Sequence, residues 1–172
     1  MVRPGRTPRP FPDRVDLLVM DFDGVISDNR VWVDASGREM IAANRSDSLG
    51  LVLLRQHTTI RQLVISKERD LVVAALCNKM GVPFLQAVDD KAAALQEYIV
   101  KNGLEACHVV FVGNDVNDLP TFSTSGYSVA VADSHPEVLR QADLVLSKKG
   151  GHGAVREICD ILLDHYQNRS QS

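Results

Sequence analysis

Runs of consecutive apolar residues alternate along this chain with segments of helical spacing, and this alternation constrains the fold most. The apolar runs cover residues 17–20, 63–65, 82–85 and 109–112. Helical spacing covers residues 47–57, 69–80, 90–102 and 153–166, with a shorter helical piece at 135–141. Strands buried on both faces read as continuous apolar runs. We therefore expect an α/β fold, a doubly wound parallel sheet, with two further short strands at 128–131 and 143–146.

A β-hairpin is predicted between the first strand and the first helix. Residues 31–34 and 38–43 have strand character and flank a turn that ends at Gly37. One domain, residues 15–166, accounts for nearly all of the 172 residues. Residues 1–14 are rich in arginine and proline, which predicts a disordered tail, and residues 167–172 form a polar tail.

Charge and composition exclude several classes of function. The net charge is −3, and because the first 14 residues carry +3, the remainder carries −6. An acidic body argues against nucleic-acid binding. We find no apolar run of the roughly 20 residues that a membrane helix needs, and no apolar signal core. The widely spaced Cys77, Cys107 and Cys159 predict buried thiols in the cytoplasm rather than a disulfide framework or zinc site.

Polar side chains follow each apolar run. Asp21 and Asp23 come after the first run and Ser66 after the second. Lys91 opens the helix after the third run, and the fourth is followed by a cluster made of Asn114, Asp115 and Asp118. In doubly wound sheets ligands bind at the carboxyl ends of the strands, so we expect these groups to share one site.

This set of groups suits phosphoryl transfer through an aspartyl-phosphate. Asp21 would attack phosphorus, while Asp23 would protonate the leaving oxygen and later activate water. Gly24 permits the bend that would separate these two roles. Mg²⁺ and Lys91 would neutralise charge, and the Ser66 hydroxyl would bond a phosphoryl oxygen.

These residues resemble the four motifs of the haloacid dehalogenase (HAD) superfamily: residues 21–25 (DFDGV), Ser66, Lys91 and residues 113–118 (GNDVND). Further segments resemble its capless sugar-acid phosphatase branch: residues 23–28, 47–50, 131–133 and 150–157. That branch contains 3-deoxy-D-manno-octulosonate 8-phosphate phosphatases, nonulosonate 9-phosphate phosphatases and the C-terminal module of acylneuraminate cytidylyltransferases. The resemblance covers residues 15–165 and implies a HAD-like Rossmannoid fold.

The resemblance also implies roles for individual residues. Asp21 is the nucleophile and Asp23 the general acid and base. Mg²⁺ is held by the Asp21 carboxylate, the Asp23 backbone carbonyl and the side chain at position 114. The family most often has aspartate there, so Asn114 removes one negative charge and should weaken Mg²⁺ binding, unless Asp115 and Asp118 compensate through ligating waters.

The substrate residues are inferred from a second departure. Octulosonate phosphatases usually continue the second motif as Thr-Gly-Arg, whereas this chain has Ser66, Lys67 and Glu68. A glutamate repels a substrate carboxylate and accepts from sugar hydroxyls, which favours nine-carbon acids, while Lys67 or Arg69 remains available to the carboxylate. Arg45, Asp47 and Arg156 are further candidates for substrate binding, with surface or intersubunit roles as alternatives.

The spacing of the motifs leaves no room for a cap domain. Only 42 residues separate Asp23 from Ser66, and 24 separate Ser66 from Lys91. Capless members of this branch typically form tetramers in which neighbours cover the site. The resemblance therefore implies a homotetramer, with the 25–43 hairpin and residues 150–156 near subunit boundaries.

The function expected from the sequence is a Mg²⁺-dependent phosphomonoesterase that acts on a small sugar-acid phosphate. The alternative is a weak or inactive phosphatase-like module that oligomerises or regulates a cytidylyltransferase. The presence of Asn114 at a metal position keeps this alternative open. A receiver-type signalling domain also combines Asp, Ser and Lys on such a sheet, but Asp23 and the hairpin argue against it.

Overall fold

A six-stranded parallel sheet forms the centre of the computed structural model, which describes residues 7–170. Its strand order is β5-β4-β1-β6-β7-β8, and each pair of neighbours is parallel. The strands are β1 (Leu17–Met20), β4 (Arg61–Ile65), β5 (Phe84–Leu85), β6 (Val109–Gly113), β7 (Tyr127–Ala130) and β8 (Leu144–Val145). From β1 the chain adds β4 and β5 on one side, and it then crosses back to add β6, β7 and β8 on the other side. The crossovers therefore run in both directions, as in a doubly wound fold.

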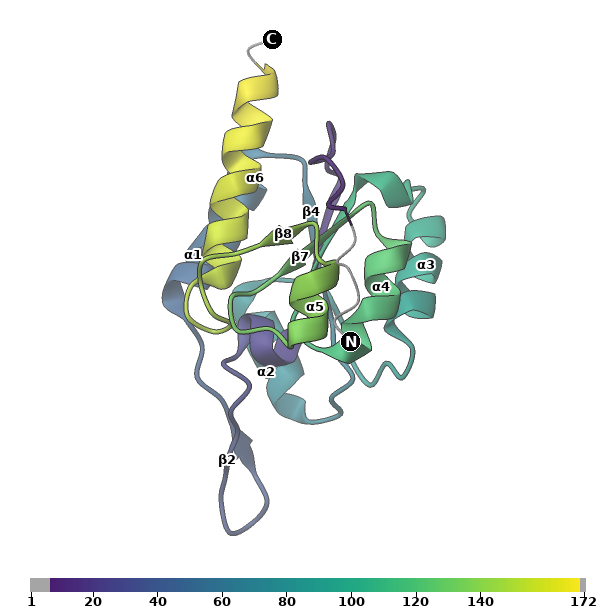
Figure 1. Cartoon of the computed structure of the whole chain (residues 1–172). Helices are drawn as coiled ribbons and strands as arrows, with labels where there is room; N and C mark the ends of the chain where they lie inside the picture. Colours follow the sequence, from purple (N-terminus) through teal and green to yellow (C-terminus); the bar gives the residue numbers. More distant parts are fainter. Residues whose placement is uncertain (1–6, 171–172) are drawn as a thin grey trace.

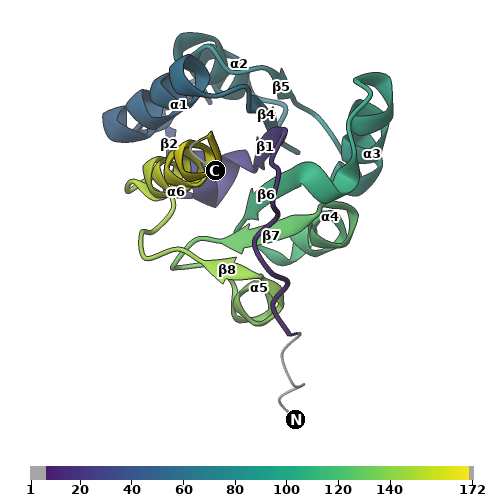
Figure 2. The same ribbon diagram turned by 90° about the horizontal axis from the view of Figure 1, so that it is seen from above.

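Helices cover both faces of this sheet (Figure 2). One layer holds α1 (Arg45–His57), α2 (Leu71–Met80) and α6 (Ala154–Ser170); the other holds α3 (Lys91–Lys101), α4 (Leu119–Thr124) and α5 (Pro136–Gln141). Alternate residues of β1 enter two separate cores: Leu18 and Met20 face the first layer, and Leu17 and Val19 face the second. A strand buried on both faces explains why β1 is a continuous apolar run.

The antiparallel hairpin projects from the body beside the first layer (Figure 1). Its strands, β2 (Trp32–Val33) and β3 (Glu39–Met40), are shorter than the sequence predicts. The turn is held by Asp34, whose carboxylate accepts hydrogen bonds from the Ser36 and Arg38 amides. Beyond this hairpin, the described residues contain no inserted unit that would act as a cap domain.

The N-terminal segment differs from the expected disordered tail in the part that the structure describes. Arg9 forms an ion pair with Asp143, 2.6 Å from Nη2 to Oδ2, and Phe11 packs edge-on against Tyr127. Local composition predicted disorder because prolines prevent regular structure, but these long-range contacts fix the segment. Residues 1–6 of the expected tail lie outside the described residues.

The C-terminal helix α6 continues to Ser170, four residues past the expected end of the domain at 166. Residues 171–172 of the expected polar tail lie outside the described residues. None of the helices in the described part of the chain combines the length and apolar character that a membrane crossing requires.

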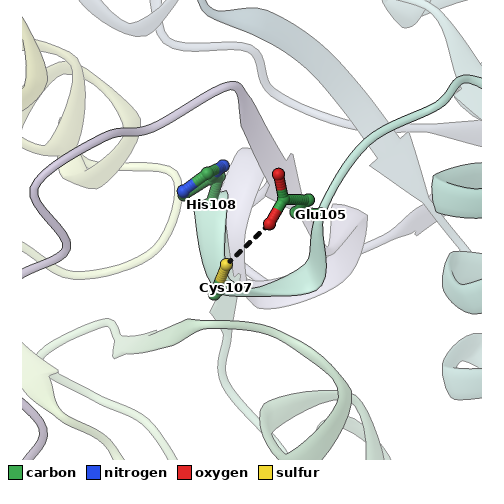
Figure 3. A group of neighbouring side chains, drawn as sticks. All are labelled: Glu105, Cys107 and His108. Carbon is green, nitrogen blue, oxygen red and sulfur yellow. Dashed lines mark hydrogen bonds between the residues drawn. The ribbon is translucent and has the colours of Figure 1, made fainter.

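The cysteines are all free, but only two of them are buried as expected. Burial raises the pKa of both the Cys77 and the Cys159 thiols to about 12. Cys107 is exposed in the turn before β6, where its thiol lies 3.8 Å from a Glu105 carboxylate oxygen, and His108 lies beside them (Figure 3). This group lies at the opposite end of β6 from Asn114 and is separate from the site described below.

Candidate active site

A pocket of about 290 Å³ opens at the carboxyl ends of the central strands. It is lined by residues from four chain segments: Asp21, Asp23, Asn29, Ser66, Lys67, Glu68, Lys91, Asn114, Asp115 and Asn117. Asp21 follows β1, Ser66 follows β4, and Asn114 follows β6, so the parallel strands bring these side chains to one edge of the sheet. The structure therefore brings together Asp21, Asp23, Ser66 and Lys91, the four residues predicted to be catalytic.

A turn at residues Phe22–Ile26 begins directly after Asp21 and contains Asp23. Asp23 has extended backbone angles within it, and Gly24 has a φ of +86°. A Cβ on Gly24 would lie 1.9 Å from the Asn114 side-chain nitrogen, so a larger residue would displace Asn114. Gly150 packs against the other side of this turn, because a Cβ there would lie 1.8 Å from the Gly24 carbonyl oxygen. Residues 150–151 thus pack directly against the catalytic turn.

Lys91 bridges two carboxylates inside the protein. Its Nζ lies 2.6 Å from Asp21 Oδ1 and 2.7 Å from Asp118 Oδ1, and all three side chains are less than a tenth exposed. Lys91 is the first residue of α3, whose N-cap Asp90 accepts a hydrogen bond from the Ala93 amide. The helix start therefore fixes the position from which the lysine reaches Asp21.

Asp118 has a different position from the one predicted for it. Its Oδ2 accepts hydrogen bonds from the amides of Asn114, at 2.9 Å, and Asp115, at 3.3 Å. Since Oδ1 bonds Lys91, both oxygens have protein partners, and the fully buried side chain does not line the pocket. Asp118 therefore orients Lys91 and the loop after β6, instead of holding waters of a metal ion as the sequence suggested.

The environment of this cluster raises the pKa of both catalytic aspartates. Burial, and then the Asp118 charge, raise the pKa of Asp21 to about 7, although Lys91 acts in the opposite direction. Burial also raises the pKa of Asp23, while a hydrogen bond from the Ser27 hydroxyl lowers it. The two carboxylates raise the pKa of Lys91 against its own desolvation, so the lysine stays charged.

The donors around Asp21 fit a hard divalent cation. Asn114 is 9% exposed, and its Oδ1 is buried and accepts no hydrogen bond from the described residues. A buried oxygen without a partner is costly unless a ligand satisfies it. Both described hydrogen bonds to the Asp21 side chain go to Oδ1. Carboxylate and carbonyl oxygens are the ligands that Mg²⁺ prefers, so Asp21, Asp23, Asn114 and Asp115 match its chemistry.

The loop after β4 forms one wall of the pocket. Ser66 is buried, and its hydroxyl oxygen accepts from the Glu68 amide at 3.1 Å, so its own proton remains for another acceptor. Lys67 and Glu68 are exposed and line the same pocket, as the sequence predicted for substrate residues. Sequence reasoning missed Asn29 and Asn117. Asn29 has a φ of 64°, and such a left-handed asparagine in a loop leaves no periodic signal.

Three predicted substrate residues lie away from this pocket. Arg45 is exposed in the first turn of α1. Asp47 is buried between α1 and α6, where its Oδ1 accepts from the Arg156 amide at 2.7 Å. The Arg156 guanidinium pairs with Asp160, on its own helix. Within one chain Asp47 and Arg156 join α1 to α6, and any contact of Arg45, Asp47 or Arg156 with substrate stays a prediction.

Comparisons with known proteins agree with this arrangement. The family model for haloacid dehalogenase-like hydrolases matches residues 54–158, more than half of the chain. The chain is also 35% identical to 3-deoxy-D-manno-octulosonate 8-phosphate phosphatase of Escherichia coli (strain K12), over 88% of this chain and 80% of that relative.

The chain belongs to the haloacid dehalogenase-like hydrolase family.

Solved structures of HAD proteins are similar over nearly the whole molecule. One from Streptomyces avermitilis, named as a HAD family hydrolase, is 41% identical with a TM-score of 0.84, and the match covers 88% of this chain and 86% of that one. The 3-deoxy-D-manno-octulosonate 8-phosphate phosphatase of Moraxella catarrhalis, in complex with magnesium, phosphate and KDO, is 30% identical with a TM-score of 0.85. That match covers 91% of this chain and 90% of that one. The predicted HAD family and its α/β fold without a cap domain are confirmed.

Proposed function

We propose that this HAD-type phosphatase is a Mg²⁺-dependent phosphomonoesterase that hydrolyses a sugar-acid phosphate through an aspartyl-phosphate. The observation that carries the proposal is the contact between Asp21 and Lys91, 2.6 Å long, beside the unpartnered Asn114 oxygen in one polar pocket. The named activity of the relatives in Escherichia coli and Moraxella catarrhalis supports the phosphatase class.

The first step would be attack by Asp21 on phosphorus. Because Lys91 and the Phe22 amide both bond Oδ1, we assign the attack to Oδ2. The new O–P bond forms as the bond to the sugar oxygen breaks. Lys91 and Lys67 offset the negative charge of nucleophile and phosphate, and the Ser66 hydroxyl donates to a phosphoryl oxygen.

Asp23 would move the proton in both steps. Its raised pKa suits a carboxyl group that protonates the leaving sugar oxygen. Once ionised, the same carboxylate accepts a proton from the water that attacks the aspartyl-phosphate, which releases inorganic phosphate and restores Asp21. Asp23 lies within the turn that begins directly after Asp21, and in this proposal its carboxyl group acts on the leaving-group side of phosphorus while Asp21 attacks from the other.

Mg²⁺ would be held by Asp21, Asp23, Asn114 and Asp115, and it supplies positive charge that lets two anions approach each other. Asn114 contributes a neutral oxygen where the family usually has a carboxylate. We therefore propose that this chain binds Mg²⁺ more weakly than its relatives and needs a higher concentration of the ion for full activity.

Glu68 bears on the choice of sugar acid. It is exposed on the pocket wall beside Lys67, at the place where octulosonate phosphatases usually carry arginine. A carboxylate there repels an acid group and accepts from hydroxyls, so we propose a nonulosonate 9-phosphate ahead of an octulosonate 8-phosphate. Lys67 would then pair with the acid group of the substrate.

Phosphate release from a panel of substrates tests this function. The panel contains octulosonate 8-phosphate, deoxynononate and N-acetylneuraminate 9-phosphates and hexose phosphates, each with saturating Mg²⁺. We expect preference for one nine-carbon acid and no release by Asp21→Asn. Absence of release from every substrate would favour the inactive, oligomerising module instead, and Asn114→Asp would then be the variant to test for restored turnover.

We also propose a homotetramer that operates in the cytoplasm. The hairpin exposes several large apolar side chains that no described part of the chain covers: Val31, Trp32, Val33 and Met40 are each 46% to 67% exposed. The tetramer would bury this hairpin and shield the open pocket from water. Sedimentation at micromolar concentration checks the proposal, and a monomer there would contradict it.

A further inference from the structure

A second pocket adjoins the active pocket at the base of the hairpin. Its volume is about 150 Å³, roughly that of five water molecules in the liquid. The two pockets share three lining residues, Asp23, Asn29 and Glu68, so one molecule can reach from the first into the second. In the proposed mechanism Asp23 protonates the leaving sugar, and because Asp23 also lines the second pocket, that sugar can extend into it.

The walls of the second pocket differ from those of the first. Lys67 and Lys91 line the active pocket, whereas the only charged side chains on the second are those of Asp23, Glu39 and Glu68. The rest of its wall is mostly apolar and consists of Phe22, Val31, Ile41, Val72 and Val73. The two lysines of the first pocket can bind an anion, although four carboxylates line that pocket too, whereas the second pocket has no cationic group among the described residues and suits hydroxyl donors with an apolar face beside them.

Glu39 is the first residue of β3, directly after the turn of the hairpin, and is partly buried. Glu39 shares the wall of this pocket with Asp23 and Glu68. Desolvation, followed by the negative charges of Asp70, Glu68 and Asp23, raises its pKa. Their mutual repulsion is relieved when a neutral group that donates hydrogen bonds lies between them.

We infer that Glu39 is a specificity-determining residue, and that the pocket at the hairpin base binds the uncharged hydroxyl-bearing part of the leaving sugar. The inference rests on the proposed phosphatase function. Glu39 accepts hydroxyl hydrogen bonds from one side and Glu68 from the other, while the apolar wall holds the carbon chain or a short acyl substituent. The acid group of the substrate lies outside this pocket, on the side of Lys67.

The test compares substrates that do and do not reach Glu39. The kcat and KM of Glu39→Ala and Glu39→Gln are measured with N-acetylneuraminate 9-phosphate, octulosonate 8-phosphate and methyl phosphate, whose single carbon ends inside the active pocket. For Glu39→Ala we expect the KM of the better sugar-acid phosphate to rise about tenfold to a hundredfold, the range for a lost hydrogen bond to a charged acceptor. Glu39→Gln keeps an acceptor and should lose less.

Methyl phosphate provides the internal control, because its KM should change by less than about twofold in both variants. Glu97→Ala provides a matched control, since it removes an exposed carboxylate from α3, which lies away from the hairpin (Figure 1). An equal change with methyl phosphate, or no change with either sugar-acid phosphate, would overturn the inference.

A binding measurement separates this inference from the proposed function. In the Asp21→Asn background, calorimetry gives the Kd of each sugar-acid phosphate with and without Glu39→Ala. A Kd that weakens tenfold supports the pocket even if the wild-type chain releases no phosphate, a result that would refute the phosphatase alone. An unchanged Kd contradicts the pocket while leaving the phosphatase intact.

Discussion

Three buried charges, those of Asp21, Lys91 and Asp118, sit together beneath the active pocket. When Asp21 is ionised, above about pH 7, two carboxylates face one ammonium and the metal-free cluster carries one net negative charge in a region of low exposure. Such a charge is costly in a folded protein. The arrangement is explained by a divalent cation, whose binding would offset the excess charge.

Replacing Asp21 by asparagine should abolish turnover and also stabilise the metal-free protein. The asparagine oxygen can still accept from Lys91 and the Phe22 amide, while the excess charge is removed. The expected gain at pH 8 is on the order of 2 kcal/mol in the free energy of unfolding. Urea unfolding in a chelator measures it.

The pH dependence has a definite sign. Because the pKa of Asp21 is raised from 3.8 to about 7 on folding, its contribution favours the native state below about pH 4 and is lost as the pH rises toward 7. Wild type should therefore lose part of its stability over that window, and Asp21→Asn should lose less, because only the raised pKa values of other carboxyl groups such as Asp23 remain. Identical pH profiles for the two proteins would contradict this explanation.

Asn114 offers a second prediction for a single residue. Asn114→Asp adds a negative charge where a buried oxygen has no protein partner, so Mg²⁺ should bind about tenfold more tightly. The Mg²⁺ concentration that gives half-maximal phosphate release measures the change. Asn117→Asp is the matched control on the same pocket wall, and a similar effect from it would point to general electrostatic attraction.

Individual helices and strands could be predicted where local pattern and tertiary burial agree. The central strands were recognised because both faces are buried, and α2 because Gly81 ends it with a φ of 66°. The short helix α4 was missed, since six residues give too few turns for a periodic signal. The start of α1 was also misplaced at residue 47: the helix begins at Arg45 and is capped by Asn44, while the Asp47 carboxylate accepts a hydrogen bond from the Arg156 amide of α6.

Asp47 should therefore matter for stability more than for catalysis. It accepts from the Arg156 amide in the first turn of α6, and Asp47→Ala should cost about 1–2 kcal/mol in the free energy of unfolding. We expect kcat/KM to change by less than about twofold. Asp160→Ala, which removes only an exposed partner of Arg156, should cost about 0.5 kcal/mol. A large loss of kcat/KM at unchanged stability would restore Asp47 as a substrate residue.

On the scale of the whole molecule, the sequence predicted the sheet and the meeting of its strand ends, because these follow from general rules for parallel folds. It did not predict that the N-terminal segment is fixed in place. Arg9 and Asp143 are 134 positions apart, and no local pattern connects them. The second pocket was missed for the same reason, since Glu39 joins the site only through the position of the hairpin.

Arg9→Ala should destabilise the whole domain. The Asp143 side chain is fully buried, and although desolvation opposes it, hydrogen bonds from Arg9 and Ser128 lower its pKa to about 2. Removing the arginine should cost about 3 kcal/mol in the free energy of unfolding. The contribution is present above about pH 4 and is lost as the pH falls toward 2.

Thermal unfolding and limited proteolysis near residue 9 measure this effect. Arg14→Ala is the control, since it removes an ion pair whose arginine is 66% exposed, and it should destabilise the protein much less than Arg9→Ala. Equal stability of the two variants would show that the Arg9 ion pair does not anchor the segment.

The central position of β1 has a consequence for how the protein reaches its active form. This strand hydrogen-bonds with β4 on one side and β6 on the other, and both neighbours come later in the chain. Both edges of β1 can be paired only after the chain has been synthesised as far as residue 112. Parallel pairings of this kind form slowly, because long loops must close first. Asp21 lies at the end of β1, so regain of activity after refolding should follow the assembly of the central sheet.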